Sequence, residues 1–200
     1  KENKEKKIRN PSFSELKPGN CIETPTHKFV VVRSATISSR STFSNAYIVK
    51  DALGEQTDEF ILKIADEKLA KLLKKEARTL KAIEAAEDER HQKHFPRLID
   101  MGMTADFKFI VKECAGPTLY QLREHFCGKK FSFASALYLC IETLEAIEHL
   151  HNLGFLKIII SPHNFRVGTK TNDRVVYMAG LSGTKTIKKP SFLPELRQDC

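Results

Sequence analysis

The sequence predicts an α+β fold in which an antiparallel sheet, accompanied by one helix, precedes a mainly helical part. Three patterns lead to this prediction. Residues 29–63 alternate apolar and polar side chains and are rich in β-branched and aromatic types, residues 67–86 carry leucines at helical spacing, and residues 133–153 continue a longer helical repeat. Many unrelated proteins share such an arrangement, so the patterns predict architecture and leave function open.

Each expected element follows from its own residues. Within residues 29–63 the segments FVVVRS, NAYIVKDALGEQ and DEFILKIA read as three strands, with turn residues at 38–44 and near Gly54. Two more strands are expected at residues 98–101 and 107–113. The small sheet should therefore contain about five antiparallel strands plus one helix.

The later helices are expected in LYQLREHF and in SFASALYLCIETLEAIEHLHNLG. Ser132 lies near the start of the longer pattern and Gly154 lies just past its end. Serine caps helix amino termini and glycine commonly follows helix carboxyl termini, so we expect this helix to run between them.

Composition excludes several classes of protein. The chain has 200 residues, of which 41% are hydrophobic and 29% are charged, as is typical of a globular domain. No apolar run approaches the roughly 18 residues that span a bilayer, and the segment KENKEKKIRN has no apolar signal core behind it. We therefore expect no membrane contact and a cytoplasmic or nuclear location.

Cysteine and charge patterns exclude two more classes. The five cysteines are an odd number without CxxC spacing, which indicates reduced thiols rather than disulfides or a metal site. The net charge of +8 comes from basic residues interspersed with acids, as in residues 65–90. This pattern favours a solvated helical face over a nucleic-acid interface.

The most specific pattern is GFLKIIISPHNF, residues 154–165. It resembles the catalytic loop of the casein kinase 1 superfamily of protein kinases, which typically reads GFLHRDIKPGNF. The segments FKFIVKECAGPTLYQLRE and ALYLCIETLEAIEHLHNLGFL extend the resemblance over residues 29–185, most closely to the tau-tubulin kinase-like branch. The resemblance implies a protein-kinase-like bilobal fold with a nucleotide cleft between a small and a large lobe.

This resemblance divides the chain into three parts. Residues 1–28 are expected to be a basic N-terminal extension, residues 29–113 a kinase-like small lobe, and residues 114–200 part of a mainly helical large lobe. The large lobe ends in the activation-segment region and is incomplete. We therefore expect the chain to be a fragment of a longer kinase-like protein.

The catalytic and metal positions depart from the kinase pattern. A kinase needs an acid that accepts the substrate proton, and an Asn and an Asp that hold magnesium. The resemblance places Ile159 at the position of the acid and Gly180 at that of the magnesium-binding Asp, while Asn164 is retained. Residues 154–165 contain no Asp or Glu in any register. We therefore expect no intact catalytic residue and no magnesium site.

Two histidines flank this loop. His151 lies at the end of the preceding helical pattern, and His163 replaces a small exposed residue of the family's loop. We expect an exposed or capping role for both rather than that of a substitute base.

The phosphate-holding pair is retained. The resemblance places Lys63 on the nucleotide phosphates and Glu76 as its ion-pair partner. Lys112 stands at the gatekeeper position, where an apolar side chain usually borders adenine. An ammonium group there must find an acid or lower its pKa; the alternative is that it extends past the pocket to solvent along its flexible stem. A poor or altered adenine pocket is the favoured expectation.

Other nucleotide positions are altered too. Glu113, Cys114 and Ala115 are expected to form the hinge. Counting back from Tyr47 puts Ser44, Ser41 and Ser39 on the three glycine positions of the phosphate loop, where a Cβ restricts positive φ. A serine-rich hairpin without a ligand role is the favoured alternative. We expect weak ATP binding at most.

These features predict a pseudokinase that acts by scaffolding or allosteric control of a partner protein, either a kinase or a kinase substrate. Enzymatic activity stays undecided from sequence, although its loss is favoured. Two alternatives stay open. One is an active serine/threonine kinase with a rearranged metal site, supported by Lys63, Glu76 and Asn164. The other is a metal-independent nucleotide-binding module in which Lys63 holds phosphate directly.

Overall fold

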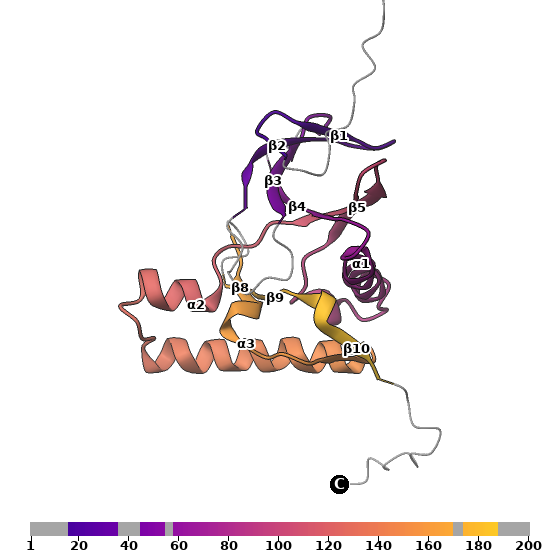
Figure 1. Ribbon diagram of the computed structural model, residues 1–200. Helices are drawn as coiled ribbons and strands as arrows, with labels where there is room; N and C mark the ends of the chain where they lie inside the picture. The colour runs from indigo at the N-terminus through magenta and orange to yellow at the C-terminus, as the bar shows by residue number, and fades with distance from the viewer. Residues whose placement is uncertain (1–15, 36–44, 55–57, 170–173, 188–200) are drawn as a thin grey trace, which may run out of the picture.

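The computed structural model describes residues 16–35, 45–54, 58–169 and 174–187. Within these residues, six strands form one antiparallel sheet that curls over a helix, in the order β1-β2-β3-β4-β6-β5 (Figure 1). The strands are β1 (Cys21–Glu23), β2 (Lys28–Ser34), β3 (Ala46–Asp51), β4 (Glu59–Ala65), β5 (Leu98–Met103) and β6 (Lys108–Glu113). The predicted α+β class and antiparallel sheet are confirmed.

The sheet has one strand more than the five expected, because β1 was missed. This strand pairs with β2, with Cys21 opposite Val30 and Glu23 opposite Lys28. Three residues are too short to show the alternation by which a strand is recognised. Ile22 is nevertheless fully buried, so the sheet extends into residues 1–28, where only an extension was expected.

One face of the sheet carries the first hydrophobic core. Successive side chains of a strand point to opposite faces, so every second residue can turn inward. The buried members of this core are Leu16, Ile22, Phe29, Val31, Tyr47, Val49, Leu62, Ile64, Phe107, Phe109 and Val111. The alternation seen in the sequence therefore corresponds to real burial.

Helix α1 (Ala70–Glu84) packs on the sheet. It is slightly shorter at both ends than the expected 67–86. Leu73 and Ala77 contact Ile110 and Ala65 of the sheet in a small core of their own. Glu76 lies on the same buried stripe of the helix and is fully buried. The helical repeat thus turns one carboxylate inward toward β4 and β6.

Two helical segments follow the sheet. Helix α2 (Leu119–Gln121) begins with a capping box between Thr118 and Gln121 and continues as a π-helical turn, Leu122–Phe126. Helix α3 (Phe133–Asn152) is capped by Ser132, whose Oγ accepts a hydrogen bond from the Ser135 N–H at 3.1 Å. Gly154 follows it with φ +80°. Both predicted cap positions are confirmed.

Short strands that follow α3 form two separate two-stranded sheets. Strand β7 (Phe155–Lys157) pairs with β10 (Thr184–Thr186), and β8 (Phe165–Val167) pairs with β9 (Val176–Met178). Short 3-10 turns at Pro162–Asn164 and Leu181–Gly183 lie between them. Asn164 directly precedes β8, and Gly180 lies two residues after β9. The β8–β9 pairing therefore brings Asn164 and Gly180 close together.

A second core joins α1 to the helical part. Figure 1 shows α3 at the opposite end of the described structure from β1, with α1, β8 and β9 between them and β10 beside one end of α3. The buried members of this core are Leu80, Ile83, Phe95, Leu119, Ala146, Leu150, Phe165, Val176, Met178 and Leu181. Among the described helices, none has the length and apolarity needed to cross a membrane.

Candidate functional site: a cavity lined by cations

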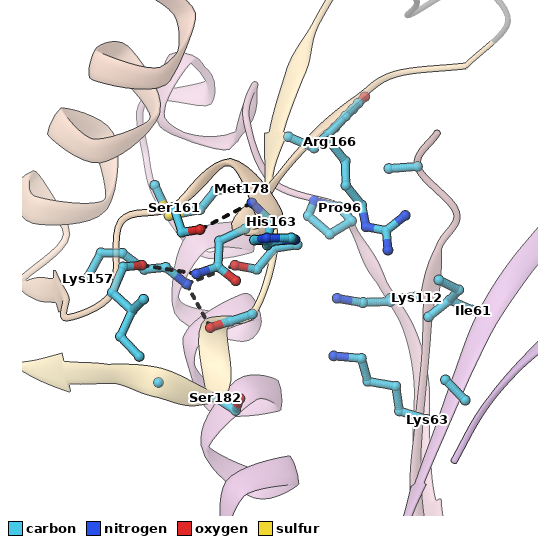
Figure 2. Close-up of a pocket in the computed structure, with 18 of the residues that line it drawn as sticks. Ile61, Lys63, Pro96, Lys112, Lys157, Ser161, His163, Arg166, Met178 and Ser182 are labelled. Carbon is cyan, nitrogen blue, oxygen red and sulfur yellow. Dashed lines mark hydrogen bonds between the residues drawn. The ribbon is translucent and has the colours of Figure 1, made fainter. Parts of the chain in front are cut away.

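A cavity of about 390 Å³ opens between the sheet and the segments that follow α3 (Figure 2). Its walls come from β4, from β6 and the residues just after it, from residues 157–166, and from residues 177–183. The residues predicted from sequence that line it are Lys63, Lys112, Glu113, Ala115, Ile159, Asn164 and Gly180. Most of the candidate positions, far apart in the sequence, therefore meet in one place.

The remaining candidates lie elsewhere. Glu76 lies behind the cavity wall, where it contacts two of the lining lysines. Cys114 is half-buried beside the lining residues Glu113 and Ala115, and burial raises the pKa of its thiol. Ser39, Ser41 and Ser44, at the expected phosphate loop, lie outside the described residues.

Lys63 and Glu76 form an ion pair. The Lys63 Nζ donates to both carboxylate oxygens of Glu76 at 2.9 Å. Strand β4 and the buried stripe of α1 hold the two side chains opposite each other. Burial lowers the pKa of Lys63 to about 8, against the opposing attraction of Glu76. The pair therefore lies in an environment that penalises charge.

Lys112 reaches the same carboxylate. Its Nζ lies 2.7 Å from the Glu76 Oε1, and its side chain is only 6% exposed. Of the three outcomes weighed from sequence, the ammonium group finds an acid and does not extend to solvent. Burial alone would raise the pKa of Glu76, but the ammonium groups of Lys112 and Lys63 outweigh it and lower that pKa to about 2. The Glu76 carboxylate thus forms ion pairs with two buried lysines.

Two further cations line the cavity. The Lys157 Nζ donates to the carbonyl oxygens of Ala179 at 2.8 Å and Gly180 at 2.7 Å, and burial lowers the pKa of Lys157 to about 8. The Arg166 guanidinium donates to the Gly116 carbonyl at 2.8 Å, and burial lowers its pKa as well. The sequence assigned a role to neither residue, and no motif marks Arg166.

Asn164 and Gly180 lie in contact. The Asn164 side chain donates to the Ile159 carbonyl at 3.1 Å, and its backbone carbonyl accepts from the Ala179 N–H at 2.7 Å. A Cβ placed on Gly180 would lie 3.0 Å from the Asn164 Oδ1. Within the described ranges, no three His, Cys, Asp or Glu side chains gather so as to hold a metal ion.

We expect Gly180→Ala to lower the free energy of unfolding by about 1–3 kcal/mol. Gly180 has φ +68°, a left-handed conformation that a Cβ disfavours, and the added methyl group would also press on Asn164. Urea denaturation measures the loss. Gly128→Ala is the matched control, because Gly128 has φ +58° and no atom within 4 Å of its virtual Cβ. An equal loss in both variants would show that the Asn164 contact adds nothing.

The two flanking histidines are half-buried rather than exposed, and one of them lines the cavity. The His163 ring lines the cavity and stacks on Tyr120 with ring centroids 4.2 Å apart. Its backbone N–H donates to the Ser161 Oγ at 3.4 Å. His151 lies in the last turn of α3 and does not line the cavity. Stacking gives His163 a packing role that the sequence did not indicate.

A curled antiparallel sheet with one helix packed on it is compatible with the small lobe of a protein kinase. Curated relatives point to the same class, although no protein-family model matches the chain. The chain is 26% identical over 156 residues to the serine/threonine-protein kinase spe-6 of Caenorhabditis elegans. The matched residues make up 78% of this chain and 39% of that protein.

Two other nematode proteins show similar levels of identity. The chain is 28% identical over 105 residues to the putative serine/threonine-protein kinase ZK507.3, covering 52% of this chain and 28% of that protein. The chain is 27% identical over 104 residues to the putative serine/threonine-protein kinase ZK507.1, covering 52% of this chain and 31% of that protein. The chain thus spans well under half the length of these relatives. Together these similarities support a protein-kinase-like domain.

Proposed function

We propose that this chain is a pseudokinase of the casein kinase 1 superfamily, in its tau-tubulin kinase-like branch, that controls a kinase or a kinase substrate by protein contact. In this proposal residues 29–113 are the small lobe and residues 114–200 are part of the large lobe of a bilobal fold. The relatives support the kinase-like class, and the cavity supports the loss of phosphotransfer. A cytoplasmic or nuclear location belongs to the same proposal.

The observation that carries the proposal is the character of the cavity wall. Phosphotransfer needs a proton acceptor and carboxylate oxygens for magnesium. At the corresponding positions the cavity presents Ile159 and Gly180. Among the described residues, the acid that lines the cavity is Glu113. Its Oε1 accepts a hydrogen bond from the Arg97 Nε at 2.6 Å, and the Glu113 side chain is 31% exposed. Asn164 offers one amide oxygen, a donor set that does not fit magnesium.

An exposed apolar face on α3 offers a surface for contact, either with the rest of a large lobe or with a partner protein. Five large apolar side chains along α3 are more than 40% exposed, and three consecutive isoleucines of the 154–165 loop are exposed too. They are Phe133, Leu137, Tyr138, Ile141, Leu144, Ile158, Ile159 and Ile160. Apolar side chains exposed in this number are normally covered, by the rest of the large lobe in a longer protein or by a partner protein.

Phosphotransfer from ATP should be undetectable. Losing the proton acceptor alone costs about 10²- to 10⁴-fold in rate, and losing the metal carboxylate acts on the same step. The chain, extended through the complete large lobe if one is encoded, is incubated with radiolabelled ATP, magnesium or manganese, and a general protein substrate, and incorporated phosphate is counted.

Lys63→Ala is the control for contaminating kinases. We expect the same background from this variant and from the natural chain. Metal-dependent incorporation that disappears in Lys63→Ala would overturn the proposal and favour the active serine/threonine kinase.

A further inference from the structure

One face of helix α1 carries basic side chains and no acid. Five such side chains lie on it, of which four are exposed and one is half-buried: Lys71, Lys74, Lys75, Arg78 and Lys81. At 3.6 residues per turn, they fall within about 120° of the helix circumference and extend over about 15 Å of its length. We call this surface the basic face of α1. It points away from the side of the helix that packs on the sheet.

The acids that alternate with these residues in the sequence lie elsewhere in the structure. Glu76 is fully buried on the other side of α1, where it pairs with two lysines of the sheet. Glu67 pairs with Lys108 at 3.6 Å, and Glu84 falls outside the sector of the basic face. Within the described part of the chain, no ion pair involves any of the five basic side chains. A helix with mixed charges in sequence therefore has a face of one sign.

This arrangement of charges opposes the stability of the helix. Like charges three or four residues apart repel each other, and Lys71 is followed at these spacings by Lys74 and Lys75. Lys74 and Lys81 are spaced in the same way from Arg78. The first turn contains no acid to offset the positive end of the helix dipole, and no side chain caps it. Negative charge supplied by another molecule would relieve the repulsion along the whole face.

The chemistry of the face favours an acidic protein segment over a membrane or a nucleic acid. A helix that binds a membrane surface inserts its apolar side chains, but those of α1, such as Leu73 and Leu80, are buried in the cores. Single-stranded nucleic acids stack on aromatic side chains, and α1 contains none. About five residues of an extended acidic segment span the 15 Å of the face, so its carboxylates can reach all the cations.

We propose that the basic face of α1 docks a segment of a partner protein that is rich in Asp and Glu. The inference rests on the proposed function and deepens it, because it names the chemistry of the partner. Exposed ion pairs contribute little individually and are screened by salt, so the contact is weak and reversible. The docked segment would lie on the helix whose opposite side carries Glu76 toward the cavity.

Fluorescence anisotropy with a labelled peptide of about ten glutamates tests the proposal, since such a peptide is longer than the face when extended. The peptide is titrated with the chain, extended through the complete large lobe if one is encoded, at low and at physiological ionic strength. We expect binding at low ionic strength that weakens by about 3-fold or more at physiological ionic strength, where the Debye length is shorter. A glycine-serine peptide of the same length should not bind.

Two double variants with equal net charge locate the contact. Lys71→Gln combined with Lys74→Gln removes two cations of the basic face, and glutamine preserves the helix propensity. Lys50→Gln combined with Lys130→Gln removes two exposed cations from β3 and from the loop before α3. We expect about a 5-fold or greater loss of peptide affinity for the α1 double variant and less than about a 2-fold loss for the control double variant.

Thermal unfolding followed by circular dichroism verifies the fold of both double variants. The α1 double variant should melt no lower than the natural chain, because it loses like-charge repulsion. A duplex oligonucleotide and phosphatidylserine vesicles are then titrated with the same proteins. Each should lose no more affinity in the α1 double variant than in the control double variant.

Three outcomes would overturn the inference. The first is no binding of polyglutamate at low ionic strength, and the second is an equal loss of peptide affinity in the two double variants. The third is a loss of duplex or vesicle binding that is confined to the α1 double variant, which would assign the face to a nucleic acid or a membrane. Peptide binding and phosphotransfer are separate measurements. A failure to bind the peptide thus removes this docking surface, whereas phosphotransfer activity removes the pseudokinase proposal.

Discussion

Glu76→Gln should lower the free energy of unfolding by about 3–5 kcal/mol, the usual cost of removing one partner from a buried ion pair. The variant keeps the size of the side chain and leaves Lys63 and Lys112 buried without their shared carboxylate. Because Glu76 is fully buried, water cannot readily replace the lost charge. Urea denaturation followed by circular dichroism measures the loss.

Two further variants isolate the cause. Glu84→Gln makes the same change on the exposed face of α1 and should shift the free energy of unfolding by less than about 0.5 kcal/mol. Adding Lys112→Met to Glu76→Gln removes one stranded cation and should recover part of the loss. A double variant less stable than Glu76→Gln would contradict the shared-carboxylate arrangement.

The loss in Glu76→Gln should shrink as pH rises toward about 8 and should then level off. Lys63 has a folded-state pKa of about 8, which burial lowers and Glu76 raises. Without Glu76, Lys63 of the folded variant releases its proton at a lower pH than in the natural chain, and this stabilises the folded variant between the two pKa values. A loss of the same size at pH 7 and pH 9.5 would contradict this account.

Leu150→Ala should lower the free energy of unfolding by about 2–5 kcal/mol. Leu150 is fully buried in the core that joins α1, α3 and the β8–β9 pair, where a deleted side chain leaves a cavity. The matched control is Leu144→Ala on the same helix, where the side chain is 65% exposed and we expect less than about 0.5 kcal/mol.

Urea denaturation of both leucine variants provides the measurement. Equal losses would show that α3 buries a different face from the one described. A larger loss for Leu144→Ala would show that its exposed face is covered in solution, for example by association of chains, and a dependence on protein concentration would then identify such association.

Local pattern was sufficient for most of the fold. The alternation in β2, β3 and β4 and the leucine spacing of α1 depend on residues a few positions apart, and such short-range periodicity is visible in a sequence. The caps of α3 at Ser132 and Gly154 were predicted for the same reason. Strand β1 was not predicted, because it is stabilised by pairing with β2 and has no recognisable pattern of its own.

The candidate site was predictable only where a resemblance supplied positions. That resemblance directed attention to Lys63, Lys112, Asn164 and Gly180, all of which line the cavity. It could not supply the role of Arg166, since no family motif marks that position.

The sequence alone thus determined the residue types available: lysines on two predicted strands, a Glu on a predicted helix, and a loop with no acid. The partner of each was decided by tertiary structure. Lys112 meets a carboxylate 36 positions earlier in the chain, and Lys157 meets carbonyl oxygens 22 and 23 positions later. Side-chain charge is a property of one residue, but its neutralisation depends on which distant segments pack together, and no local pattern encodes that packing.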